Sequence, residues 1–135
     1  MTLINPPRYR EKRWKLAIGA YQGLDRAAVD ELQKAVQTHL PYVLEVQRGA
    51  ELAELEAGAN TILVGAGQSN PWVGRALEQA RLPLPPGPQG YTLALIPSLW
   101  RPEDRVLLVA GWDEAGILYG VQELCRLLDA HNHSI

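Results

Sequence analysis

The first group of residues that could do chemistry is a turn containing Gly65, Gly67, Ser69 and Asn70, between an apolar run and a helical pattern. Glycines in such a turn allow backbone amides to approach a phosphate or pyrophosphate group. The dinucleotide fingerprint also requires a third glycine, which Asn70 replaces, and a later acidic residue, which is missing over 79–102. We therefore interpret the turn as structural. Its alternative role is to bind a small ligand or an anion at a helix N-terminus.

Other polar groups do not form a catalytic or metal-binding pattern. Asp113 and Glu114 are adjacent, whereas the two carboxylates of a glycosidase lie roughly 5–9.5 Å apart across a cleft. We interpret this pair as the first turn of a helix. Cys125 lies on an apolar helical face, and His131 and His133 lie close to the end of the chain, where no fixed coordination geometry is expected. The sequence predicts no catalytic residue, no metal site and no cofactor.

The composition limits the classes of partner. The chain has 135 residues, of which 47% are hydrophobic and 21% charged, and its net charge is −2. These values are typical of one globular domain and provide no basic field to attract nucleic acid. The chain contains no apolar run near the ~20 residues that span a bilayer, and its start lacks the pattern of a signal peptide. We expect neither nucleic acid nor a membrane as a partner, and a cytoplasmic location if the ends are native.

The spacing of apolar residues predicts the elements that position these groups. Predicted strands cover 14–21, 42–47, 61–64, 91–96 and 105–110, and predicted helices cover 25–40, 70–82 and 113–131. Asp25 is expected to cap the first helix, and Asn70 and Pro71 begin the second. The final two strands form a long hairpin, which excludes a purely parallel sheet.

The predicted fold is an α+β sandwich with the order β-α-β-β-α-β-β-α. We expect a mixed, largely antiparallel sheet of about five strands, with three helices packed on one face. A flavodoxin-like layout is the alternative. Residues 14–130 form this single domain, residues 1–13 a basic N-terminal extension, and residues 131–135 a frayed tail.

Two glycines in the last predicted helix indicate close packing. Gly116 and Gly120 lie one turn apart, and a glycine costs a helix interior about 1 kcal/mol relative to alanine. Both positions therefore predict close approach by another element. Together with Tyr119, they form the candidate interface.

Tryptophans could provide a platform for a sugar ring. Trp100, in the predicted hairpin loop, is the best candidate for such a platform. Trp14, Trp72 and Trp112 are expected to pack in the interior.

Three segments carry a family resemblance: ILVG over 62–65 followed by Asn70 and Pro71, GPQGY over 87–91, and AGWDEAGILYGVQEL over 110–124. Residues 14–129 resemble the small α+β domain that precedes the catalytic barrel in several glycoside hydrolase families, notably β-N-acetylhexosaminidases and α-glucuronidases. Gln89 departs from the glutamate often found there.

The resemblance implies a non-catalytic accessory or scaffolding domain. In those enzymes the catalytic carboxylates belong to the barrel, and the helices of this domain lie between its sheet and the barrel. The expected partner is therefore a glycosidase barrel in cis or in trans, or a second copy of the chain. Whether the protein is part of an enzyme stays open. The alternative is a free-standing module that binds a small ligand or an anion through the 65–70 turn.

Overall fold

The computed structural model describes residues 13–52, 58–98 and 103–130, which form a five-stranded sheet with three α-helices. The strands are β1 (Trp14–Ile18), β2 (Glu45–Arg48), β3 (Asn60–Gly65), β4 (Tyr91–Pro97) and β5 (Arg105–Gly111). The helices are α2 (Gly23–Gln37), α3 (Pro71–Gln79) and α4 (Glu114–Ala130), and the short 3-10 turn η1 (Gly49–Glu51) follows β2. The predicted α+β class, order of elements and mixed sheet are confirmed.

Several predictions concern residues outside the described part of the chain. These are the basic extension over residues 1–12, the tail over 131–135 with its histidines His131 and His133, and the sugar platform at Trp100.

The predicted predominance of antiparallel pairs is wrong. The strands pair in the order β2-β1-β3-β5-β4. β1 runs parallel to both β2 and β3, and β3 runs parallel to β5. Within the described sheet, antiparallel pairing is confined to the hairpin of β4 and β5. β2 is parallel to β1 because the crossover through α2 returns the chain to the end of the sheet where β1 begins, whereas β5 is parallel to β3 because the hairpin from β4 reverses the direction of the chain.

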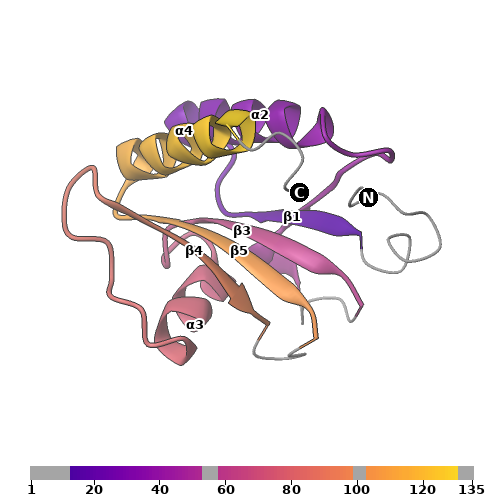
Figure 1. Ribbon diagram of the computed structural model, residues 1–135. Coiled ribbons are helices and arrows are strands. Elements are labelled where there is room, and N and C mark those ends of the chain that lie inside the picture. Colours follow the sequence, from indigo (N-terminus) through magenta and orange to yellow (C-terminus); the bar gives the residue numbers. More distant parts are fainter. Residues whose placement is uncertain (1–12, 53–57, 99–102, 131–135) are drawn as a thin grey trace.

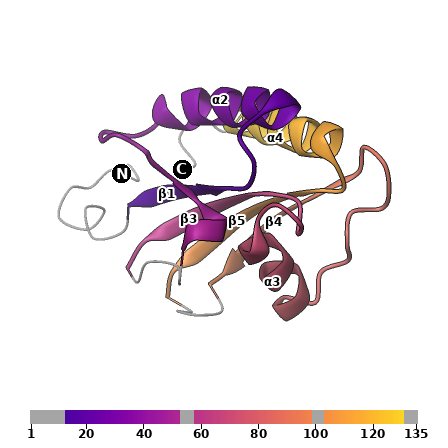
Figure 2. The ribbon, with the colours of Figure 1, turned by 180° about the vertical axis from the view of Figure 1, so that it is seen from behind.

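The helices cover both faces of the sheet, not one face as predicted. α2 and α4 lie together on one face, and α3 lies on the other (Figures 1 and 2). β3 requires this arrangement because its side chains are buried on both faces: Ile62 and Val64 pack beneath α2 and α4, whereas Leu63 packs against α3. A strand that is apolar at every position is stable only with cover on each side.

The N-terminus of α2 is not capped by Asp25. Gln22 holds the N-cap position without a side-chain hydrogen bond, and Asp25 is buried inside the first turn. The backbone amide of Leu24 instead donates to Glu114, at the start of α4, at 3.0 Å. The first turn of α2 is therefore held by a residue 90 positions later in the chain.

The glycines of α4 allow this helix to approach the sheet closely. A side chain at Gly116 would collide with the backbone carbonyl of Gly90, and one at Gly120 would press on Val109 and Tyr91 at 3.0–3.2 Å. The predicted close approach is confirmed. Among the described residues, no helix is long and apolar enough to cross a bilayer.

Candidate functional site

The candidate site lies where two neighbouring parallel strands send the chain to opposite faces of the sheet. β3 leads into α3 on one face, and β5 leads into α4 on the other. Such a divergence opens a crevice outside the carboxyl ends of the strands, where open α/β sheets commonly bind ligands. The topology therefore points to the gap between the ends of β3 and β5.

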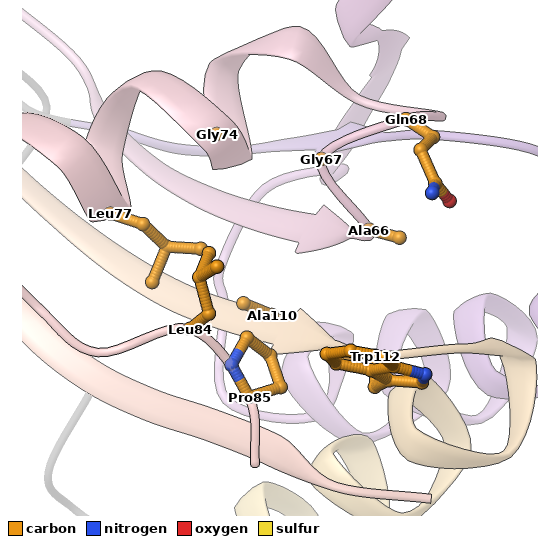
Figure 3. A pocket seen from close by; sticks show the side chains of 10 residues that line it. Ala66, Gly67, Gln68, Gly74, Leu77, Leu84, Pro85, Ala110 and Trp112 are labelled. Atoms are coloured by element: carbon orange, nitrogen blue, oxygen red, sulfur yellow. The ribbon is translucent and has the colours of Figure 1, made fainter. Parts of the chain in front are cut away.

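A groove of about 320 Å³ occupies this position. Figure 3 shows the 66–68 turn on one side of it, and Pro85 and Trp112 on the other. Its volume lies at the lower end of the roughly 300–1,000 Å³ of small-molecule pockets. The lining residues come from the ends of β3 and β5, from α3 and from the loop before β4: Ala66, Gly67, Gln68, Gly74, Leu77, Leu84, Pro85, Ala110, Gly111 and Trp112.

The lining of the groove is uncharged. Its exposed apolar side chains are Leu84, which is 70% exposed, and Trp112, which is 49% exposed. The amide of Gln68 is the longest polar side chain among the lining residues. This surface suits a neutral ligand or an apolar partner surface, and it lacks the cation that would favour a phosphate. It also lacks a side chain that could act as a general acid or base.

The exposure of Trp112 differs from the sequence prediction. Trp72, in the first turn of α3, is 2% exposed and packs between this helix and the sheet, as expected for an interior aromatic residue. Trp112 follows the last residue of β5 and therefore leaves the sheet before α4 can cover it. A tryptophan directly after a buried strand was the signal that could have located the groove.

Asn70 fixes the predicted turn in place. Its side-chain nitrogen donates to the carbonyls of Ala17 and Val64 at 3.1 and 3.0 Å, and its side-chain oxygen accepts from the amide of Trp72 at 3.2 Å. The backbone carbonyl of Asn70 accepts from Val73. Since Pro71 has no amide proton, the first amides of α3 are already satisfied.

Ser69 packs closely against Gly19, directly after β1, and against Gly65 at the end of β3. A side chain at Gly19 would lie 2.5 Å from the hydroxyl oxygen of Ser69. Gly65 has φ +144, which excludes most other residues. Of the four predicted ligand-binding residues, Gly67 lines the groove, whereas Gly65, Ser69 and Asn70 support the turn behind it.

No family model and no curated protein matches this chain. A solved structure of a glycoside hydrolase is similar to the fold of this chain. The matching structure is that of a GH138 enzyme targeting pectin rhamnogalacturonan II, with a TM-score of 0.51 and 14% sequence identity. The match covers 89% of this chain and 14% of that chain. The likeness concerns the fold, and this chain corresponds to a small part of the larger enzyme.

The residues of the candidate interface are divided between the interior and the surface of the domain. Gly116 and Gly120 are buried against the sheet, whereas Tyr119 is 44% exposed on the outer side of α4. Tyr119 is therefore the predicted interface residue that can meet a partner.

The adjacent carboxylates serve the ends of helices. Asp113 accepts from the amide of Gly116 at 2.9 Å and from that of Gln89 at 3.2 Å. Glu114 accepts from the amide of Leu24. Their predicted place in the first turn of a helix is confirmed. The described residues contain no group of three His, Cys, Asp or Glu side chains placed to hold a metal ion.

Proposed function

We propose that this chain acts as a non-catalytic accessory domain of a carbohydrate-active glycoside hydrolase. The observation that carries the proposal is the structural match, in which nearly the whole fold corresponds to 14% of a glycoside hydrolase. The resemblance to the domain before the barrel of hexosaminidases and α-glucuronidases points in the same direction. The role is to pack against a catalytic barrel, in cis or in trans, and help to fix its position.

The chemistry of the described surface favours scaffolding over catalysis. Asp113 and Glu114 are engaged by backbone amides, and the groove has no titratable side chain. Some of the exposed apolar side chains, Leu24, Trp112 and Tyr119, lie on or beside α2 and α4. Large apolar side chains in water mark a surface that meets a partner when they are contiguous. We assign the contact with the barrel to this side of the domain.

The exposed apolar surface can be tested on the 135-residue protein by sedimentation and by binding of anilinonaphthalene sulfonate. We expect dye binding or self-association, and expect Trp112→Ala to reduce it. Val43→Ser is the control because Val43 is exposed in the loop between α2 and β2. A monomeric protein that binds no dye, or equal effects of the two variants, contradicts the assigned surface.

The second candidate function is binding of a small neutral ligand in the groove. It is favoured by the position of the groove between the diverging ends of β3 and β5. NMR titration with neutral monosaccharides and with inorganic phosphate separates the two functions. Saturable shifts at Gly67, Gln68 and the Trp112 indole support the ligand-binding module, and their absence favours the scaffold.

A further inference from the structure

The N-terminal turns of α2 and α4 bring two carboxylic acids together. The two helices pack side by side on one face of the sheet (Figure 2). Glu114, the first residue of α4, accepts a hydrogen bond from the backbone amide of Leu24 in α2. Asp25, the next residue of α2, is 7% exposed. The junction of the helices thus contains a hydrogen-bonded carboxylate beside a buried one.

Asp25 has an unsatisfied oxygen. Among the described residues, its Oδ1 atom is buried and has no hydrogen-bond partner. A buried charged oxygen without a partner costs more than a neutral one, so burial favours the protonated acid. Burial, with a smaller contribution from the negative charge of Glu114, raises the pKa of Asp25 from 3.8 to about 6.

The neighbouring charges do not compensate Asp25. The guanidinium of Arg26 lies over the ring of Tyr21 at 5.4 Å and 3.9 Å from a carboxylate oxygen of Asp30. Asp113 directs its carboxylate to the amides of Gly116 and Gln89. The charge that acts on Asp25 from the packed helix is that of Glu114. The helix N-terminus favours an ionised carboxylate, but burial and repulsion outweigh this effect.

We propose that Asp25 and Glu114 form a proton-binding pair that makes the junction of α2 and α4 sensitive to pH. In neutral solution Asp25 is ionised, and its repulsion with the carboxylate of Glu114 weakens the hold of Glu114 on the first turn of α2. In mildly acidic solution Asp25 takes up one proton and becomes a neutral acid, which removes the repulsion. The hydrogen bond from Leu24 to Glu114 then tightens.

The consequence extends to the candidate site because Trp112 lies two residues before Glu114 and lines the groove. Gly23 also lies at the junction: its φ is +57, and a side chain there would come within 2.9 Å of the Glu114 carboxylate. Loosening of Glu114 therefore affects the start of α2 and the segment that carries Trp112. This inference does not depend on the proposed function.

The proposal is tested by following the side-chain carboxyl resonances of the 135-residue protein through a pH titration. We expect a midpoint near 6 for Asp25, a lower midpoint in Glu114→Gln, and no change in Glu31→Gln, an exposed acid on the same helix. A midpoint for Asp25 at or below about 4, its ordinary range, overturns the proposal.

A second readout reports the helix junction itself. Amide exchange of Leu24, corrected for its intrinsic rate, is expected to slow about tenfold between about pH 7.5 and pH 5. Asp25→Asn should abolish this change, and the indole resonance of Trp112 should follow the same titration as Asp25. Protection of Leu24 that does not depend on pH contradicts the proposal. If Asp25→Asn fails to fold, the wild-type and Glu114→Gln titrations still decide the matter.

Discussion

The side-chain nitrogen of Asn70 donates to the backbone carbonyl of Ala17, which lies 53 residues earlier in the chain, at 3.1 Å. The same side chain bonds to Val64 and caps α3. One buried residue therefore joins β1, β3 and α3 behind the groove. A position that resembled part of a ligand-binding motif has a structural role in the described fold.

Replacement of Asn70 by alanine should destabilise the protein strongly. The change removes a helix cap and leaves two buried carbonyl groups without their donor, which together cost about 2–4 kcal/mol of unfolding free energy. Chemical denaturation provides the measurement. Gln68→Ala, an exposed amide in the same turn, is the control and should change stability by less than about 0.5 kcal/mol. Similar effects of the two substitutions would contradict the assigned role of Asn70.

Two helical glycines should respond differently to replacement by alanine. Gly116→Ala places a methyl group against the carbonyl of Gly90, and we expect a loss of about 1–3 kcal/mol of unfolding free energy. Gly74→Ala in α3 meets only the backbone of Gly67 at 3.8 Å. It should be neutral or should stabilise the protein by up to about 1 kcal/mol. Equal losses of stability in the two variants would show that the packing of α4 is not the cause.

The stability of the protein should carry a contribution from Asp25 that grows as the pH falls. The folded-state pKa of Asp25, about 6, lies above its ordinary value of 3.8, so the folded state binds the proton more tightly. Between about pH 7.5 and pH 5, this group should add about 1.4 kcal/mol to the unfolding free energy. Denaturation of the wild type and Asp25→Asn at both pH values isolates the difference. A constant difference between the two proteins would contradict the prediction.

Cys125 should react slowly with alkylating reagents. Burial raises the pKa of its thiol to about 11, with smaller contributions from the negative charges of Glu31 and Asp129. Because the thiolate is the reactive form, alkylation at about pH 8.5 should be on the order of a hundredfold slower than for a free thiol. Mass spectrometry gives the rate, and the urea-unfolded protein is the control. A folded protein that reacts as fast as the unfolded one would contradict the predicted environment.

Features that depend on neighbouring residues could be predicted from the sequence. Asn70 and Pro71 predict the start of α3, because an N-cap residue and a first-turn proline affect only the backbone within a few positions of them. The hairpin of β4 and β5 follows from two apolar runs separated by a polar loop. Gly116 and Gly120 likewise indicated a close approach to their helix.

Features that depend on distant parts of the chain could not be predicted in the same way. Periodicity reports which residues are buried, but it does not report whether paired strands run parallel or antiparallel. The cap of α2 comes from Glu114 instead of Asp25, because the two helices meet only in the folded protein. The groove was missed for the same reason: Gly67 and Trp112 line it together from the ends of two paired strands.

The central claim, that this domain works beside a glycoside hydrolase barrel, is tested most directly on the endogenous protein. Immunocapture from the source cells, followed by intact-mass measurement and peptide sequencing, shows what the chain is joined to. We expect a polypeptide several times the 14.9 kDa of this chain, or a bound second subunit, whose peptides include a glycosidase barrel and which hydrolyses glycosides. A species near 14.9 kDa with no such subunit would contradict the claim.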